Sequence, residues 1–342
     1  MKITVLAYLD KEDGEIADIV VGQVAAALRK GGHRVSVFGV HGDPRKLISG
    51  LIRRRPELVF NLMEMFGDNL LGAVPVVGAL DLLGVPYTGA GPGEYYLQED
   101  KALTKKLLAF DGIGYPDFAV FSQDADLETG GKLHMPLFVK PLRMDASIGI
   151  GARSLVHNPR EMMERVTEIH KKVHDAALVE EYIEGREFYV GVLGNVEPVA
   201  FPPIEMEFNG LPVGAPHIVD SRAKWNEHSA EYKGTRAVVA DLPDELRARL
   251  QKIALDAYRA LRVRDYGRID LRVTETGDIY VIEVNASCYL EQSSEFAVAA
   301  GASSMEYPAL INRIADLAMN RHQHRSPRLR ARPRWPREHA VT

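Results

Sequence analysis

The sequence predicts an α/β domain followed by two α+β lobes, and three features predict it. Apolar strands alternate with amphipathic helices over the first hundred residues, which is typical of a parallel sheet covered on both faces. Around Asp100 the chain changes to shorter strands and fewer helices. Its 342 residues exceed one ordinary core. We expect an N-terminal domain over 1–98, a central lobe over 99–194, a C-terminal lobe over 195–320 and a disordered basic tail over 321–342.

In the first domain, we expect strands at 3–8, 34–40, 57–62 and 85–88 and helices at 16–30, 44–55 and 74–83. No G-x-G-x-x-G follows the first strand, so the dinucleotide-binding fingerprint is missing. The glycine-rich segment 89–93 lacks the Lys-Ser/Thr ending of a P-loop. We interpret that segment as a turn.

In the central lobe, we expect a helix at 101–108, strands at 117–121 and 137–140, a loop at 143–151, a helix at 159–174 and a strand at 177–183, with 185–193 as its hairpin partner. The small residues and glycines of the loop suit close approach of backbone N–H groups to phosphate oxygens. The following segment 221–234 is long, polar and aperiodic, which is typical of a lid or binding loop.

The C-terminal lobe is predicted to contain a helix at 246–261, a hairpin at 266–285 and a last helix at 303–319. Beyond Asn320 the chain is rich in Arg and Pro and poor in aliphatic residues, which predicts disorder. A solubilising tail and a tail that binds nucleic acid or membrane are the alternatives.

Composition narrows the class of protein. The net charge of −5 argues against nucleic acid as the main partner. A single cysteine, Cys288, provides neither a disulfide framework nor a thiolate metal cluster. The apolar N-terminus is too short for a signal peptide, and no segment reaches membrane-spanning length. We expect a cytoplasmic protein without a nucleic-acid or membrane partner.

The hairpin at 266–285 concentrates the polar chemistry. Because strand residues alternate faces, Arg268 and Asp270 share one face of its first strand, and Glu283 and Asn285 share one face of its second. Carboxylate and amide oxygens suit Mg²⁺. The alternative is a salt-bridged hairpin on a solvated sheet face.

Charged side chains in the central lobe add a second group of candidates. Lys101 and Lys140 stand at the ends of elements, where their ammonium groups can point inward. Glu180, Glu181 and Glu187 bracket a turn and could accept hydrogen bonds from amino or ribose hydroxyl groups. Solvated surface charge is the simpler alternative for each.

Several motifs in the same order resemble the ATP-grasp superfamily, and within it the D-alanine–D-alanine ligase group. They are VPYTGAG at 85–91, DKALTK at 100–105, FVKPLRMDASIGI at 138–150, LVEEYIEGREF at 178–188, GRID at 267–270 and IEVN at 282–285. The resemblance runs from residue 1 to about 320. It implies an ATP-grasp fold with an N-terminal pre-ATP-grasp domain.

The resemblance implies a nucleotide site in the central lobe. Lys101 and Lys140 would contact ATP phosphates, and the loop around Ser147 would close over the β- and γ-phosphates. Lys224 matches a lid lysine that reaches the γ-phosphate. The turn residues would hold the nucleoside: Glu180 at the adenine amino group, the backbone of Tyr182 and Ile183 at the ring edge, Glu187 at the ribose, and Glu181 beside them.

It also implies a metal site and a reacting centre. Asp270, Glu283 and Asn285 would bind two Mg²⁺ ions, with Mn²⁺ as an alternative, and Arg268 would stabilise charge at the reacting centre. The family reaction phosphorylates a carboxylate to an acyl phosphate, which an amine then attacks. Positioning and electrostatic stabilisation account for most of such catalysis. The residues with implied catalytic roles are Arg268, Lys224, Ser147 and Glu15.

The residues for the organic substrates depart from the family pattern. Glu15 keeps the spacing of a glutamate that holds the first substrate's amino group, but its usual serine and tyrosine partners correspond to Ala146 and Trp225. Ser294 fits a position that binds the second substrate's carboxylate, yet Glu295 stands beside it. The histidine-glycine pair expected after the third strand is missing, and Cys288-Tyr289 replaces Pro-Gly.

These departures favour an ATP- and Mg²⁺-dependent carboxylate–amine ligase with altered substrates. Its partners would be small carboxylates and amines, amino acids foremost, and a homodimer is one assembly that stays open. A genuine D-alanine–D-alanine ligase and a non-catalytic ATP-binding protein are the alternatives. The complete metal set argues against the last, because binding ATP alone does not require it.

Overall fold

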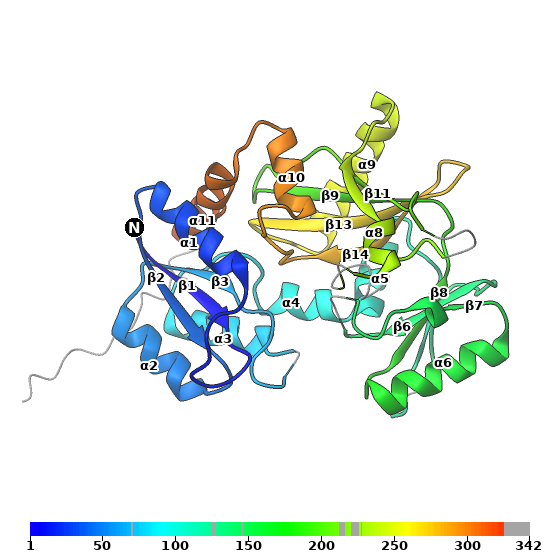
Figure 1. Cartoon of the computed structure of the whole chain (residues 1–342), viewed down its shortest axis with the longest axis horizontal. Coiled ribbons are helices and arrows are strands. Elements are labelled where there is room, and N and C mark those ends of the chain that lie inside the picture. The colour runs from blue at the N-terminus through cyan, green and yellow to red at the C-terminus, as the bar shows by residue number, and fades with distance from the viewer. Residues whose placement is uncertain are drawn as a thin grey trace, which may run out of the picture.

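The computed structural model describes residues 1–69, 71–124, 127–144, 147–211, 216–219, 226 and 228–324. Within these residues the chain forms one parallel and two mainly antiparallel sheets, each with helices packed against it (Figure 1). The predicted mixture of an α/β domain with α+β lobes is therefore confirmed.

The N-terminal sheet has the parallel order β2-β1-β3, formed by Arg34–Val40, Lys2–Tyr8 and Leu58–Leu62. Helices α1 (Ile19–Lys30), α2 (Pro44–Arg54) and α3 (Ala73–Leu83) accompany it. The predicted fourth strand at 85–88 is wrong, because it is reduced to a single bridge between Val59 and Tyr87. Pro86 accepts a hydrogen bond from Val59 N but has no N–H with which to continue a ladder.

Two short helices lead out of this domain. The turn predicted at 89–93 is wrong in its second half, because α4 (Pro92–Glu99) begins there. The Glu94 carboxylate accepts from Gly91 N at 2.8 Å, and Pro92 occupies the first helical position, where a missing N–H costs nothing. Helix α5 (Lys101–Phe110) follows, capped by the Asp100 carboxylate on Leu103 N.

The central sheet has five strands in the order β5-β4-β8-β6-β7. They are Glu128–Gly130, Phe118–Phe121, Ala177–Glu181, Leu137–Pro141 and Leu155–Val156. The short 3-10 turn η1 (Ala152–Ser154) precedes β7, and α6 (Pro159–Lys172) packs on this sheet through Val166 and Ile169.

The third sheet has the order β12-β11-β9-β13-β14, with β10 (Val199–Ala200) also paired to β9. The strands are Arg236–Val239, Ile204–Glu207, Arg186–Leu193, Tyr266–Val273 and Ile279–Asn285. The predicted pairing of 185–193 with 177–183 is wrong, because β9 pairs with β13 and β11 while β8 pairs with β4 and β6. The chain leaves the central sheet at Gly185, whose φ of +150° strains any residue with a Cβ.

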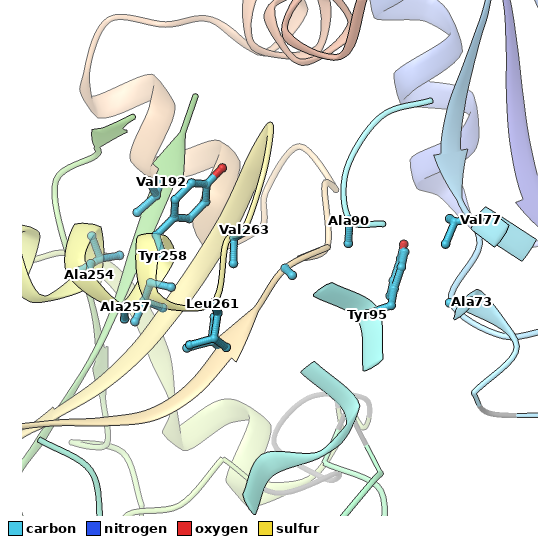
Figure 2. Packing of buried hydrophobic residues seen from close by; sticks show 14 of the residues in the cluster. Ala73, Val77, Ala90, Tyr95, Val192, Ala254, Ala257, Tyr258, Leu261 and Val263 are labelled. Atoms are coloured by element: carbon cyan, nitrogen blue, oxygen red, sulfur yellow. The ribbon is translucent and has the colours of Figure 1, made fainter. Parts of the chain in front are cut away.

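Helices cover both faces of the third sheet because alternate residues of β9 face opposite sides. Phe188, Val190 and Val192 belong to the core that contains α9 (Asp244–Ala260). Figure 2 shows Tyr258, Ala254 and Ala257 of that helix beside Val192. Tyr189 and Leu193 belong to the core on the opposite face, which includes α10 (Glu295–Ala302) and α11 (Tyr307–His324). The short helix α8 (Ala230–Gly234) lies next to β12 in the chain.

The C-terminal helices differ from the prediction. A single helix at 303–319 was expected, whereas α10 was missed and α11 extends to His324. Helix α11 packs on α1 of the first domain, where Asn312 donates to Ala27 O at 2.9 Å (Figure 1). Disorder from Arg321 onward is therefore wrong for 321–324, and 325–342 lie outside the described residues.

Among the described helices, none combines the length and the apolar character needed to cross a lipid bilayer.

Candidate active site

A cavity lined by residues of both sheets opens between the central and the third sheets. Apolar side chains of Phe138, Ile150 and Ile282 form part of its wall. Nine residues predicted for the nucleotide and metal sites also line it: Lys140, Ser147, Glu180, Glu181, Tyr182, Ile183, Glu187, Asp270 and Glu283. Folding thus brings together residues from five strands or their ends.

Two lysines and a glutamate form a buried charged group, of which Lys140 and Glu180 line this cavity and Lys105 lines a smaller recess. The Oε1 atom of Glu180 lies 2.7 Å from Lys140 Nζ, and Oε2 lies 2.9 Å from Lys105 Nζ. The second contact is an ion pair without hydrogen-bond geometry. Burial alone would raise the pKa of Glu180, but Lys105 and Lys140 outweigh burial and lower it. Burial lowers the pKa of Lys105, and Glu180 opposes that shift.

Lys105 is a residue that the sequence analysis missed. It stands one helical turn after Lys101 on α5 and is buried. The i, i+4 spacing of the two lysines was the available signal, since it places both on one helix face. With Lys140, it supplies two positive charges to one carboxylate, so the group as a whole is cationic.

Lys101 reaches the predicted metal residues from the side of α5. Its Nζ donates to Met144 O at 2.9 Å and lies 3.5 Å from Glu283 Oε1. It does not line the large cavity but a smaller recess that also contains Glu283. Lys101 therefore links the loop after β6 to strand β14.

The loop after β6 is held against the segment 216–219. Ser147 has a left-handed φ of +60°, and its hydroxyl donates to Val219 O at 2.9 Å. Tyr182 Oη and the Arg272 guanidinium both donate to His217 O. The His217 ring stacks on Phe208 with centroids 5.1 Å apart. Ile218 and Val219 consequently form part of the cavity wall.

Arg272 is the second residue that the sequence analysis missed. It donates to Glu187 Oε2 through Nε at 3.1 Å and Nη2 at 2.6 Å, and to Ile183 O through Nη1 at 2.9 Å. Burial would lower the pKa of Arg272, but Glu187 and Tyr182 raise it. Its position two residues after Asp270 on the same strand face was the signal.

Internal contacts also hold the turn residues predicted to contact the nucleoside. Glu187 Oε1 accepts from Tyr189 Oη at 2.7 Å, in addition to its pairing with Arg272. The Glu181 carboxylate accepts from His134 N at 3.0 Å. Tyr182 N donates to Pro136 O at 3.2 Å. The side chains and the backbone of this turn are thus fixed before any ligand binds.

The predicted metal residues face one another across β13 and β14. Register pairs Asp270 with Glu283 and Arg268 with Asn285. Asp270 accepts from Arg268 Nε at 2.7 Å and Nη2 at 2.9 Å, and from Asn285 Nδ2 at 3.2 Å. This arrangement contains the ion pair of the salt-bridged alternative, but it lies at a cavity and is mostly buried.

The donor set fits a hard divalent cation. Two carboxylates and an amide oxygen on adjacent strands are the ligands that Mg²⁺ prefers, with water and substrate phosphates completing the shell. In the part of the chain that the structure describes, no three His, Cys, Asp or Glu side chains gather in a metal-binding group. A cation here would compete with Arg268 for the oxygens of Asp270.

Three described residues were predicted to bind the organic substrates, and none of them lines this cavity: Glu15, Arg268 and Ser294. Glu15 is exposed in the segment between β1 and α1 and does not line the cavity. Its neighbour Asp18 accepts from Tyr289 Oη at 2.9 Å, and Gln23 donates to Glu291 at 2.8 Å. The start of α1 therefore meets the loop that precedes Ser294. Lys224, Trp225 and Ala146 lie outside the described residues.

Comparisons with known proteins agree with this geometry. Residues 107–316 match the family model "D-ala D-ala ligase C-terminus". The chain is 34% identical over 319 residues to the protein y4sG of Sinorhizobium fredii, covering 90% of this chain and 89% of the relative. It is 31% identical to the D-alanine–D-alanine ligase of Desulforudis audaxviator, covering 87% and 92%. Among solved structures, the D-alanine–D-alanine ligase of Bacillus anthracis complexed with ATP matches with a TM-score of 0.76 at 23% identity, covering 95% and 100%.

Proposed function

The chain belongs to the D-alanine–D-alanine ligase family of ATP- and Mg²⁺-dependent enzymes that form C–N bonds, and we propose that it joins a carboxylate to an amine through an acyl phosphate. In this proposal the two substrates are not a pair of D-alanines. The convergence of Lys140, Ser147, Asp270 and Glu283 on one cavity carries this proposal. Binding of a nucleotide alone would not require the carboxylates of β13 and β14 to lie beside the lysine.

Different residues of the cavity would contact the phosphates, the adenine and the ribose of ATP. Glu180 fixes the ammonium of Lys140, which then faces the ATP phosphates. Ser147 and its loop cover those phosphates from the side of the segment 216–219. Phe138, Ile150 and Ile282 offer apolar surface to the adenine ring, and Glu187 offers carboxylate oxygens to the ribose. Glu180 would accept from the adenine amino group while one of its oxygens stays paired with Lys140.

The reaction proceeds in two balanced steps. An oxygen of the substrate carboxylate attacks the γ-phosphorus, the bond to the β-phosphate oxygen breaks, and ADP leaves. The amine nitrogen then attacks the acyl carbon, and the bond from that carbon to the oxygen of the acyl phosphate breaks. Inorganic phosphate leaves with this oxygen, and the nitrogen loses a proton. Mg²⁺ held by Asp270, Glu283 and Asn285 would neutralise phosphate charge. Arg268 stabilises negative charge on the reacting oxygens from the neighbouring strand position.

Local contacts support an altered substrate pocket. Glu295 lies 3.2 Å from the Arg268 guanidinium. Asn61 begins the segment 61–67 that stands in place of the family's histidine-glycine pair, and it donates to Tyr95 Oη at 3.3 Å. Tyr95 Oη in turn donates to Ser287 Oγ at 2.9 Å. Asn61, Tyr95 and Ser287 thus form one hydrogen-bonded chain that joins β3, α4 and the loop after β14.

A genuine D-alanine–D-alanine ligase is the second candidate. Relatives with that name are about 30% identical over most of the chain, such as the protein of Aquifex aeolicus with 29% identity over 91% of this chain. Such extensive similarity supports retention of the family substrate.

Product analysis separates the two candidates. The purified protein is incubated with ATP, Mg²⁺ and pairs drawn from D- and L-amino acids, amino-acid amides and small carboxylic acids, and ADP and products are measured by mass spectrometry. We expect ADP release that needs both an acid and an amine, with the best pair differing from D-alanine plus D-alanine. D-alanyl-D-alanine as the main product would establish the second candidate. ADP release independent of acid and amine would overturn both.

A further inference from the structure

We infer that Glu295 makes the enzyme select an amine that carries no carboxylate beside its amino group. This inference rests on the proposed ligase function and specifies its second substrate. Glu295 is the first residue of α10, and its Oε2 lies 3.2 Å from Arg268 Nη1.

Arg268 is already matched by carboxylates on two edges. Its Nε and Nη2 donate to the two oxygens of Asp270 at 2.7 and 2.9 Å, and Nη1 donates to Glu295. The Tyr189 ring covers one face of the guanidinium at 4.8 Å. Only 12% of the Arg268 side chain remains exposed. A substrate carboxylate that paired with either of these edges would have to displace Asp270 or Glu295, while the remaining N–H groups can still face a single reacting oxygen.

The surrounding charges reinforce this barrier. Because Asp270 is assigned to the metal ion, Glu295 is the carboxylate that remains paired with Arg268 on the other edge. Lys101 does not offset the charge of Glu295, because its Nζ is paired with Glu283 Oε1 at 3.5 Å. A second carboxylate brought close to Glu295 would meet like charge, which disfavours binding. An amino or amide group would instead find an acceptor, because 26% of the Glu295 side chain is exposed.

Glu295 lies on the side of Arg268 where the amine substrate, rather than the acid substrate, would bind. Asp270 lines the nucleotide cavity, whereas Glu295 does not and holds the opposite edge of the guanidinium. The acid must reach the γ-phosphate from the cavity side. The amine attacks after phosphoryl transfer and needs the remaining side of Arg268, where Glu295 stands.

The contacts of Ser294 independently support an amine substrate without a carboxylate. Its hydroxyl is within hydrogen-bond distance of two backbone carbonyls, Tyr289 O at 3.1 Å and Glu291 O at 2.6 Å. The donor expected to bind a substrate carboxylate is therefore turned toward its own loop. Both groups that would receive a carboxylate here already have protein partners.

Matched amines test the inference. With the acid substrate that the product analysis identifies, kcat/KM is measured for alanine and alaninamide, in both stereochemical forms, as substrates or as competitive inhibitors. The enzymes are the wild type, Glu295→Gln and Glu306→Gln, the last removing an exposed charge beyond α10. Thermal unfolding establishes that all three fold.

We expect the wild type to prefer alaninamide and Glu295→Gln to lower that preference by about tenfold to a hundredfold, the range of a charge-assisted contact. Glu306→Gln should keep the wild-type ratio. Comparing ratios between enzymes removes the difference in basicity between the two amines. A ratio that Glu295→Gln leaves unchanged, or a wild type that prefers alanine, overturns the inference while ligase activity stands. If no amine acts as substrate or inhibitor, the proposed function falls and the inference with it.

Discussion

At the scale of single residues, buried charges near the cavity are arranged as shared groups rather than as isolated pairs. Glu180 serves two lysines, Asp270 serves Arg268 and Asn285, and Glu187 serves Arg272 and Tyr189. Removing one member of such a group leaves an uncompensated charge in a poorly solvated place, which costs more than an intact pair contributes. The site is therefore sensitive to single substitutions.

The first prediction concerns the metal residues. Asp270→Asn should lower amide-bond formation at least about a hundredfold, because loss of a metal-binding carboxylate removes stabilisation of the transferred phosphoryl group. Steady-state ligation kinetics across a Mg²⁺ titration measure this effect. Glu275→Gln, in the exposed turn of the same hairpin, is the charge-matched control. Unchanged ligation by Asp270→Asn would contradict the metal assignment.

The second prediction concerns Glu180. Glu180→Gln should lower the free energy of unfolding by about 3–5 kcal/mol at pH 7, because it leaves Lys105 and Lys140 buried without a counter-charge. Since the pKa of Glu180 is lowered in the folded state from 4.5, its stabilisation is complete above that value and is lost as pH falls through the folded pKa. The difference between wild type and variant should therefore shrink in acid.

Urea unfolding at pH 7 and at a series of pH values below 4.5 measures both parts of the Glu180 prediction. The exposed neighbour Glu184→Gln should change stability little at any of these pH values. Equal stability of Glu180→Gln and wild type at pH 7 would show that the two lysines are solvated.

At the scale of elements, the positions of the strands were easier to predict than which strands pair with one another in a sheet. The alternation of apolar residues located both strands of the hairpin at 266–285, and with it the shared face of Asp270 and Glu283. The partner of β9 could not be predicted, because pairing with β13 spans more than seventy residues and leaves no local pattern. Lys105 and Arg272 were missed for a related reason, since a charged residue in isolation predicts a solvated surface.

Gly185 marks the change of partner and carries the third prediction. An added Cβ would lie 2.0 Å from Val273 O, and φ is +150°. Gly185→Ala should lower the free energy of unfolding by about 1–3 kcal/mol through backbone strain and displacement of β13. Thermal and urea unfolding measure it. Gly93→Ala is the control, because Gly93 lies in α4 with no atom within 4 Å of the new Cβ. A variant as stable as wild type would mean that the turn adapts without strain.

At the scale of the whole molecule, one buried carboxylate joins three distant segments. Asp265 is fully buried and accepts from Gly89 N at 2.9 Å, Asn195 Nδ2 at 3.0 Å and Arg321 Nη2 at 2.7 Å. Arg321 also donates to Tyr87 O at 2.8 Å. The basic composition after Asn320 concealed this role, because one arginine of the segment continues the helical face of α11. The first domain, the third sheet and the last helix thus meet at one ion pair.

The fourth prediction follows from this junction. A chain ending at Asn320 should lose about 3–5 kcal/mol of unfolding free energy relative to one ending at His324, because it leaves Asp265 without its guanidinium. Urea unfolding compares the two truncations. Arg321→Met in the full chain should reproduce most of the loss, whereas Arg313→Met on the same helix should not. Equal stability of the two truncated chains would remove the structural role of Arg321.

The change of partner at Gly185 also has a mechanical consequence. The central sheet is built from one continuous stretch of chain, 118–181, so it joins the remainder covalently at only two places. Both places touch the same hairpin: Gly114 O accepts from Val281 N at 2.8 Å, and Gly185 abuts Val273 O. No strand of the central sheet pairs with a strand of the third sheet among the described residues. The width of the cavity between them therefore depends on side-chain contacts such as Lys105 with Glu180 and Ser147 with Val219.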